Sequence, residues 1–228
     1  MRLVLASNNA KKLAELSALF AELPLQLVTQ GGLGIAEAEE PHASFLENAL
    51  AKARHAARAC GGAAIADDSG VCVQALGGAP GVISAHYAGE VGPQADREAD
   101  READREVDRE VDREAMRRLQ DAANNARLLR ELESLGPGAD RRARFVCTLV
   151  AIRAADDPEP LVAVGRWEGE ILLAQQGTGG FGYDPLMFIP ALGRTVAELD
   201  AQEKNRVSHR AQAAAQMLLL LRQGWHLG

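Results

Sequence analysis

The sequence predicts an α/β protein in which an elongated, mixed and twisted sheet is flanked by helices. Short apolar runs suited to buried strands, such as residues 3–6 and 63–66, alternate with segments in which leucine or alanine recurs at helical spacing. Two further strand-like runs, residues 144–152 and 161–167, are separated by one short turn, which favours an antiparallel pair. With 228 residues, 47% of them hydrophobic, the chain is long enough for one domain with a sizeable core.

The first predicted strand ends at the polar turn Ser7-Asn8-Asn9, and a helix follows. A strand, a polar turn and a helix in this order place the first N–H groups of the helix at the carboxyl end of the strand, a natural site for phosphate. Lys11 and Lys12 lie in the first helical turn, where the helix dipole disfavours a cation, so an anionic partner is expected there. The alternative is an Asn N-cap followed by two solvated lysines.

A second strand is expected over residues 25–29, followed by a loop rich in glutamate. Ser44 and Glu47 then have the spacing of a capping box, in which each side chain satisfies a backbone N–H at the start of a helix. This pair predicts that a helix begins at about residue 45 and continues to about residue 60.

The third strand, residues 63–66, runs into Asp67-Asp68-Ser69-Gly70. The two carboxylates are therefore expected at a strand end, with a tight turn at Gly70. Because consecutive residues on extended backbone point to opposite sides, they cannot do the same job. One can accept backbone N–H bonds and fix the loop, while the other can face a cleft and hold a divalent cation such as Mg²⁺. The alternative is a plain turn, since these residue types are favoured in turns.

Residues 95–114 form a repeat: Ala-Asp-Arg-Glu three times, then Val-Asp-Arg-Glu twice. A period of four drifts against the helical repeat, so Ala and Val cannot form one straight apolar stripe, and like charges fall on neighbouring turns. The repeat is expected to be a solvated, marginal helix or disordered. It belongs to a charged, low-complexity insert at about residues 91–140, within a single domain that spans residues 1–228.

Charge and composition exclude several classes of protein. The net charge is −7, but the repeat holds ten acidic and five basic residues, so the rest carries 22 acidic and 20 basic residues. With no basic stripe, no nucleic-acid partner is expected. The three cysteines lie far apart, as expected for core residues in a reducing compartment. Neither a signal peptide nor a membrane-spanning run is expected, so the prediction is a cytoplasmic protein without a membrane partner.

A glycine-rich segment, residues 177–185, surrounds Phe181 and Tyr183. Glycines leave the backbone exposed beside two aromatic rings, an arrangement suited to a flat base that slides between ring and main chain. Asp184 precedes Pro185 and is therefore held out of the helical region, which fixes the direction of its carboxylate. The alternative is a glycine-rich hairpin whose rings fill the core.

The last predicted helix opens with Ser208-His209-Arg210. A serine cap, an imidazole and a guanidinium at a helix N-terminus can address phosphate or the acceptor edge of a purine. The alternative is a capped helix with two exposed polar residues.

Together these motifs resemble, in order, those of the noncanonical purine nucleoside triphosphate pyrophosphatases, a family that includes the inosine triphosphate pyrophosphatases. The motifs are residues 7–12, 66–70, 77–81, 181–185 and 208–210, and the resemblance covers about residues 1–90 and 143–223. Across the insert the family has a much shorter connection. The resemblance implies Mg²⁺-dependent hydrolysis of ITP, dITP and XTP to the monophosphate and pyrophosphate. It also implies an elongated α/β fold of two lobes with a central substrate cleft, in a homodimer.

The resemblance also assigns roles to residues. Asp68 would be the catalytic carboxylate, activating water or binding metal, and Glu39 would be a second metal ligand, with the adjacent Glu40 as the alternative. The triphosphate would be held by Ser7, Asn8, Asn9, Ala10, Lys11 and Lys12, and Ser69 would touch the substrate. The base and sugar would be surrounded by Phe181, Gly182, Tyr183, Asp184, Lys204, His209 and Arg210.

Two other functions remain open from the sequence alone. The first is a pyrophosphatase of the septum-inhibitor type, which shares the architecture but acts on modified pyrimidine or methylated nucleotides. The second is a non-catalytic module, in which the α/β body binds nucleotide and the charged repeat binds a partner. A screen of nucleotide substrates distinguishes the first, and deletion of the repeat distinguishes the second.

Overall fold

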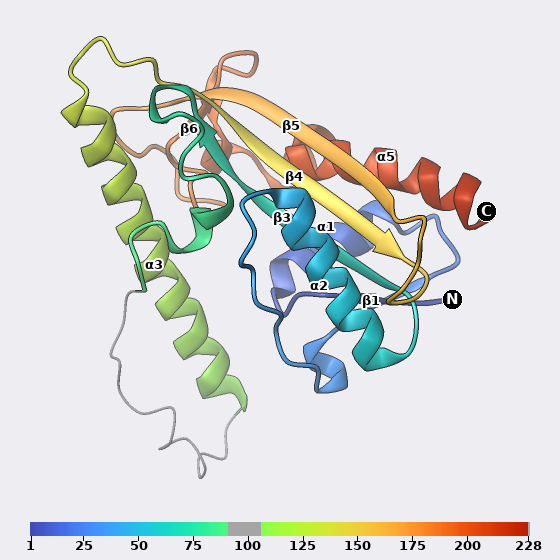
Figure 1. Ribbon diagram of the computed structural model, residues 1–228. Helices are drawn as coiled ribbons and strands as arrows, with labels where there is room; N and C mark the ends of the chain where they lie inside the picture. Colours follow the sequence, from blue (N-terminus) through green and yellow to red (C-terminus); the bar gives the residue numbers. More distant parts are fainter. Residues whose placement is uncertain (91–105, 228) are drawn as a thin grey trace.

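The computed structural model describes residues 1–90 and 106–227, with the side chains of Lys11 and of residues 106–113 left out of the description. One mixed sheet of seven strands runs through it, in the order β2-β1-β3-β4-β5-β6-β7 (Figure 1). The strands are β1 (Arg2–Leu5), β2 (Gln26–Thr29), β3 (Ala64–Val73), β4 (Arg142–Ile152), β5 (Leu161–Ile171), β6 (Met187–Ile189) and β7 (Arg194–Thr195). The mixed α/β class predicted from the sequence is confirmed.

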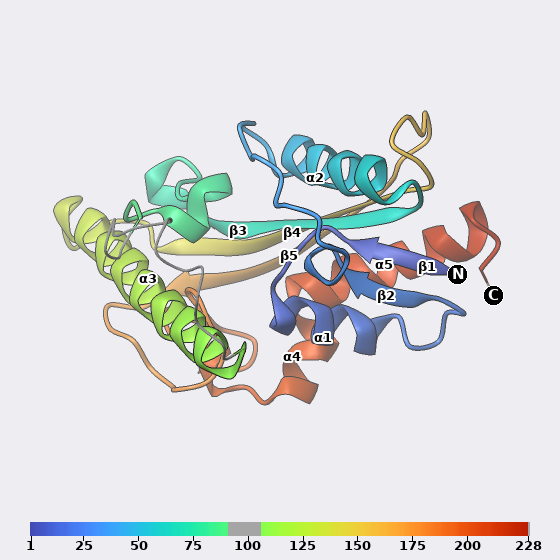
Figure 2. The same ribbon diagram turned by 90° about the horizontal axis from the view of Figure 1, so that it is seen from below.

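Helices cover both faces of the sheet (Figure 2). On one face lies α2 (Phe45–Cys60), and on the other lie α1 (Ala10–Leu19), α4 (Ala201–Val207) and α5 (His209–Gly224). The long helix α3 (Glu106–Ser134) packs at the far end of β3–β5, opposite the chain termini. Short 3₁₀ turns lie at Gly31–Leu33, Gln74–Leu76, Gly81–His86 and Val196–Glu198. Among the described helices, none is long and apolar enough to cross a bilayer.

The serine caps predicted from the sequence are confirmed, but the capping box at Ser44 is only half formed, because the Glu47 carboxylate accepts from the Ser44 hydroxyl and not from its backbone N–H. The Ser44 hydroxyl accepts a hydrogen bond from the backbone N–H of Glu47 at the start of α2, and that of Ser208 accepts one from Ala211 at the start of α5. Each cap satisfies an N–H group that has no partner within the helix. The predicted antiparallel pair of β4 and β5 is also present, from Arg142↔Glu170 to Ala151↔Leu161.

The strand that carries the two aspartates is longer than predicted. Instead of ending at Asp67, β3 continues through Gly70 to Val73 and pairs with β4 along its full length. The prediction of a strand end with a tight turn was therefore wrong, because pairing with β4 outweighs the local turn preference of these residues. The alternation of side chains is retained, so Asp67 and Asp68 lie on opposite faces of the sheet.

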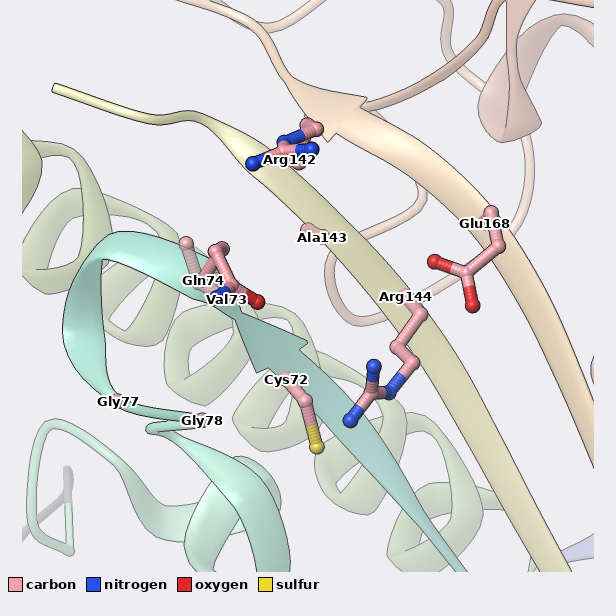
Figure 3. Close-up of a pocket in the computed structure, with 9 residues that line it drawn as sticks. All are labelled: Cys72, Val73, Gln74, Gly77, Gly78, Arg142, Ala143, Arg144 and Glu168. Atoms are coloured by element: carbon pink, nitrogen blue, oxygen red, sulfur yellow. The ribbon is translucent and has the colours of Figure 1, made fainter.

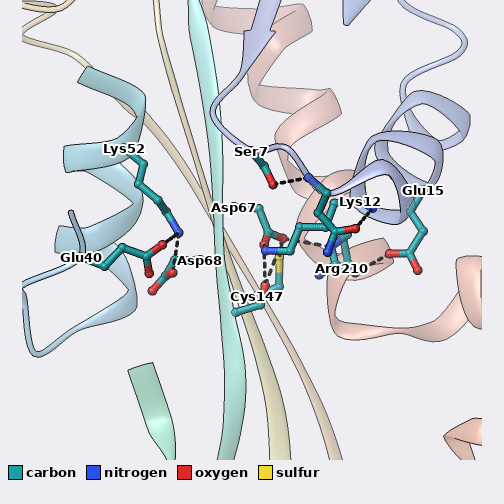
Figure 4. Close-up of polar contacts among 11 residues, drawn as sticks. Ser7, Lys12, Glu15, Glu40, Lys52, Asp67, Asp68, Cys147 and Arg210 are labelled. Atoms are coloured by element: carbon teal, nitrogen blue, oxygen red, sulfur yellow. Dashed lines mark hydrogen bonds and ion pairs between the residues drawn. The ribbon is translucent and has the colours of Figure 1, made fainter. Parts of the chain in front are cut away.

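On its other side, β3 is only partly paired. Strand β1 matches it at Val4↔Ala64 and Leu5↔Ile65, after which the chain turns away into α1. Further along, the same edge of β3 contacts residues 79–84: the Val71 N–H donates to Ser84, the Val73 N–H donates to the carbonyl of Ala79, and an isolated bridge follows the same line. Between these contacts and the pairing with β1, residues 66–70 have no strand partner on this edge within the described part of the chain, and Ser7 lies beside them (Figure 4). Because both aspartates lie within residues 66–70, their side chains flank this edge from the two faces.

Three apolar clusters form the core of the described chain. Two of them sandwich the sheet near the termini, one around Leu16 and Met217 against α1 and α5, the other around Ala53 and Val150 against α2. The third lies at the far end, where Leu128 of α3 packs with residues of β3–β6. The polar side chains of Asp67 and Asp68 fall between these apolar regions, in the middle of β3.

The insert predicted at about residues 91–140 is described only in part. Residues 95–105 of the repeat lie outside the described residues, whereas residues 106–114 form the first turns of α3. From Gln120 onward, α3 contacts the rest of the chain through polar side chains and buried leucines.

Candidate functional site

Two polar centres lie back to back across β3 (Figure 4). Asp67 points towards α1 and α5, where it meets Lys12 and Arg210, while Asp68 points towards α2, where it meets Lys52. The two carboxylates therefore point to opposite faces of the sheet, as strand alternation predicts. Adjacent residues of one strand carry the two centres.

Asp67 is a fully buried carboxylate with a complete set of donors. Its Oδ2 accepts from Arg210 Nε at 2.9 Å, its Oδ1 forms an ion pair with Lys12, and the Ser69 hydroxyl and the Cys147 thiol also donate to it. Burial opposes ionisation, but Arg210 and Lys12 outweigh it, so the pKa of Asp67 lies well below its usual range. Asp67 is therefore a permanent anion that holds two cations in place, and the acceptance of backbone N–H bonds expected for it is replaced by side-chain donors.

Ion pairs extend from this centre towards the glycine-rich loop. Arg210 also pairs with Glu15 of α1, and Glu15 lies 4.0 Å from the ammonium of Lys204. Lys204 in turn donates to Asp184 at 2.7 Å, and both side chains are at least nine-tenths buried. A continuous row of alternating charges thus connects the first strands with the loop that carries Phe181.

The turn around Phe181 is held by its own backbone and by Asp184. Asp184 Oδ2 accepts from the backbone N–H of Phe181 at 2.9 Å, and a Cβ at Gly180 would collide with that carboxylate, so only glycine fits there. The Lys204 ammonium lies 4.3 Å from the centre of the Phe181 ring. Phe181 is half-buried, whereas Tyr183 is a buried member of the far-end core and donates its hydroxyl to the carbonyl of Ser84.

His209 is the first residue of α5. Its ring stacks on Phe145 of β4 with centroids 4.9 Å apart, and its Nδ1 is buried without a partner among the described residues. Burial, together with the neighbouring charge of Arg210, places the pKa of His209 well below its usual range, so the ring is neutral at pH 7. Gly165 of β5 permits this packing, because a Cβ there would collide with the backbone of His209.

Asp68 has a different environment from its neighbour. Its Oδ1 accepts from Lys52 Nζ at 2.6 Å, and the same ammonium lies 3.1 Å from Glu40, but its Oδ2 is buried without a partner among the described residues. Burial raises the pKa of Asp68 to about 6; Lys52 acts in the opposite direction, and Glu40 adds to the rise. A buried carboxylate with one free oxygen, beside a second carboxylate and a lysine, is typical of a reactive site.

The Ser7–Asn9 turn is ordered by its own side chains. Ser7 Oγ accepts from the backbone N–H of Asn9, and Asn9 Oδ1 accepts from that of Lys12, which caps α1. The Asn8 amide donates to Glu37 at 3.1 Å, so this turn is attached to the glutamate-rich loop that leads to Glu40. The two faces of β3 are thereby linked around its open edge.

The structure brings most of the predicted site residues together. Lys12, Lys204, Asp184 and Arg210 belong to the charge row, and Ser69, Phe181, Gly182 and His209 contact it or lie beside it. Ala10 is the first residue of α1, and the side chain of Lys11 lies outside the described part. Glu39 and Glu40 are both exposed, and it is Glu40 that contacts Lys52, whose ammonium also binds Asp68.

Three residues of the site were missed by sequence reasoning: Glu15, Lys52 and the Cys147 thiol. The sequence held one usable signal, since Lys52 lies among Ala49, Ala53 and Ala56 on the buried face of α2. A lysine in a buried stripe of alanines requires a carboxylate partner, because a lone ammonium is too costly to bury. Glu15 and Cys147 gave no comparable signal.

A cavity of about 280 Å³ lies elsewhere on the sheet, near the far end of β3–β5 (Figure 3). It is lined by Arg142, Arg144 and Glu168, by the thiol of Cys72, and by the Gly77–Gly78 turn. None of the predicted catalytic or base-binding residues lines it. Its arginines lie apart from both aspartate centres.

Comparison with known proteins identifies close relatives. The sequence model of the Ham1 family matches residues 3–118 and 108–219. The chain is 66% identical over 225 residues to a protein of Methylibium petroleiphilum named dITP/XTP pyrophosphatase, with 99% of each chain covered. It is 65% identical over 227 residues to a protein of the same name from Leptothrix cholodnii, with 100% of each covered. The solved structure of a HAM1 protein from Coxiella burnetii shares 39% identity with a TM-score of 0.81, covering 97% of this chain and 98% of that one.

Proposed function

Because the chain belongs to the Ham1 family, we propose that it hydrolyses noncanonical purine nucleoside triphosphates, among them dITP, ITP and XTP, to the monophosphate and pyrophosphate. The resemblance drawn from the sequence motifs is confirmed at the level of the family. The observation that carries the proposal is Asp68: a buried carboxylate with one oxygen that no described residue contacts, next in sequence to the residue that holds Lys12.

The open edge of β3 is the proposed place for the triphosphate. Lys12 and the N-terminus of α1 lie on one side of this edge, and Lys52 lies on the other. Cations on both sides suit a tetra-anionic chain of phosphates, and N–H groups at the start of a helix are natural donors to phosphate. The Ser7–Asn9 turn would lie along the same edge, which is consistent with the triphosphate-binding role expected for these residues.

Asp68 is the proposed general base. In the reaction, a water oxygen bonds to the α-phosphorus, the bond to the oxygen that bridges to the β-phosphorus breaks, and pyrophosphate leaves. The carboxylate of Asp68 accepts the proton of the attacking water, and a base with a pKa near the working pH is suited to this step. Lys52 stabilises the negative charge that develops on the phosphate oxygens.

A divalent cation fits beside Asp68. The described residues contain no cluster of three or more His, Cys, Asp or Glu side chains suited to a metal, but Mg²⁺ needs only one or two carboxylates when phosphates and water complete its shell. Asp68 and Glu40, which share the ammonium of Lys52, are the proposed ligands, and Glu40 takes the place first assigned to Glu39. When bound, Mg²⁺ supplies positive charge to the phosphate oxygens.

The base end of the site is proposed where Phe181 and Lys204 meet the start of α5. A 6-keto purine presents an acceptor at position 6, where adenine presents an amino donor. The ammonium of Lys204 and the guanidinium of Arg210 can only donate, so they favour the keto base. An adenine would leave such donors unpaired in a desolvated place, which costs about 1–3 kcal/mol.

Release of pyrophosphate, measured with Mg²⁺ over a panel of nucleotides, tests the proposal. We expect rapid release from dITP, ITP and XTP and little from dATP, with no release by Asp68→Asn. Release confined to dUTP or 7-methyl-GTP would favour the septum-inhibitor type instead. An inactive wild type that still binds dITP would favour the non-catalytic module. We further propose a homodimer in the cytoplasm, where the deaminated nucleotides of the cellular pool arise.

A further inference from the structure

The helix α3 holds the glycine-rich loop, residues 177–185, through the backbone of Gly182. Gly182 lies between the two aromatic residues of this loop and adopts a left-handed conformation with φ +62°. Its backbone N–H donates to Asp121 Oδ2 at 2.8 Å, and its carbonyl accepts from Asn125 Nδ2 at 2.9 Å. Asp121 and Asn125 are one helical turn apart, so they meet both polar groups of a single residue.

The C-terminal half of α3 is firmly attached to the body. The amide of Asn124 donates to the carbonyls of Ser84 and Ala85 and accepts from the backbone N–H of Ala88. One and two turns further on, Leu128 and Leu132 are fully buried in the far-end core. A helix fixed in this way is a rigid support for whatever its polar face holds.

The contacts to Gly182 adjoin those that hold the backbone of Phe181. The carbonyl of Phe181 accepts from the backbone N–H of Asp184, and its own N–H donates to the Asp184 carboxylate. With Gly182 tied to α3 as well, the backbone polar groups on both sides of the Phe181–Gly182 bond are engaged, which leaves the ring little freedom to rotate about the turn. None of these contacts involves the triphosphate end of the site.

We propose that Asp121 and Asn125 are positioning residues for the nucleobase: by holding Gly182 they fix the Phe181 ring, and with it the selectivity for the base. This inference rests on the proposed function. It assigns a role to the part of α3 that follows the charged repeat, which none of the sequence motifs indicated. Both residues act through Gly182 and neither contacts the phosphates.

Isosteric variants test the proposal. Asn125→Asp loses the donor to the Gly182 carbonyl, whereas Asp121→Asn keeps an oxygen that accepts from the Gly182 N–H. We expect Asn125→Asp to raise KM for dITP about five- to tenfold, the equivalent of one hydrogen bond, with little change in kcat. The ratio of kcat/KM for dITP to that for dATP falls by a similar factor. Asp121→Asn keeps values close to wild type, while Asp121→Ala behaves like Asn125→Asp.

A control variant separates this role from general stability. Asp157 is a buried carboxylate that accepts from the N–H groups of Arg153 and Glu159 in the β4–β5 turn, away from both centres. Asp157→Ala is expected to lower Tm without changing KM or the dITP to dATP ratio.

Hydrogen exchange of the Gly182 amide gives a second readout that is independent of activity. Exchange is expected to accelerate in Asp121→Ala and to stay slow in Asp157→Ala. Accelerated exchange with unchanged KM and ratio would overturn the positioning role, and so would unchanged exchange. A wild type that releases no pyrophosphate from dITP would instead overturn the proposed function, while the exchange result would still report whether α3 holds the loop.

Discussion

The two adjacent aspartates respond in opposite directions to the same change of carboxylate to amide. Asp67 lies between Arg210 and Lys12, and its side chain and that of Arg210 are 0% and 3% exposed. Asp67→Asn removes one of the two carboxylates that pair with the buried guanidinium of Arg210. Removing one partner of a buried ion pair costs about 3–5 kcal/mol of unfolding free energy. For a chain of this length that lowers Tm by roughly 6–20 °C.

Asp68→Asn is expected to preserve or raise stability. The ordinary pKa of this group is 3.8 and the folded value is about 6, because burial disfavours the charged form. At pH 7.5 the ionised side chain therefore lowers the unfolding free energy by up to about 3 kcal/mol. The uncharged amide avoids this cost but loses part of the contact with Lys52. The free energy of unfolding of the variant should therefore exceed that of the wild type by no more than this cost, and should not fall below it. Pyrophosphate release is lost in this variant, since the general base is gone.

The assay is urea unfolding of both variants and the wild type at pH 7.5, followed by circular dichroism, with pyrophosphate release measured on the same preparations. The prediction is a marked loss of stability in Asp67→Asn, and lost activity without lost stability in Asp68→Asn. Equal destabilisation by the two changes would refute the assignment of a structural role to one and a reactive role to the other. So would full activity in Asp68→Asn.

Three further predictions concern pH, metal and the repeat. Because burial, and then the charge of Arg210, depresses the pKa of His209 in the folded state, its stabilising contribution is present above pH 6.5 and lost below it. Between pH 6.5 and 5 the free energy of unfolding of the wild type, measured with urea, should fall by up to about 1.4 kcal/mol per pH unit relative to that of His209→Gln. The same pH dependence in both proteins would exclude this explanation. Glu40→Gln should raise the Mg²⁺ concentration for half-maximal pyrophosphate release by roughly tenfold or more, which corresponds to a loss of about 1.4 kcal/mol in binding. Glu39→Gln should leave this concentration unchanged. The opposite result would restore Glu39 as the metal ligand. Deletion of residues 95–114 should keep most pyrophosphate release from dITP, since a surface insertion costs little closure entropy, and loss of activity in a folded deletion variant would contradict this.

Local signals in the sequence were sufficient for much of the fold. Ser44 and Ser208 predicted the starts of α2 and α5, because a cap is satisfied within its own helical turn. The β4–β5 pair followed from two apolar runs and a short turn. Strand alternation predicted that Asp67 and Asp68 would separate, since it depends only on extended backbone.

Features that depend on distant contacts were not predictable in this way. The continuation of β3 past Asp67 depends on pairing with β4, about 80 residues later, and overrides the local turn signal. Glu40 reaches Lys52 only because the loop between them folds back over α2, so neighbouring glutamates could not be told apart by sequence. The grip of Asn125 on Gly182 joins residues 57 apart.

The position of bound substrate tests the central claim most directly. Crystals of Asp68→Asn grown with dITP and Mg²⁺ should hold the triphosphate along the open edge of β3, with the α-phosphate beside residue 68, the remaining phosphates between Lys12 and Lys52, and the hypoxanthine against Phe181. A triphosphate bound instead in the cavity beside Arg144, or on one face of the sheet away from residue 68, would contradict the account.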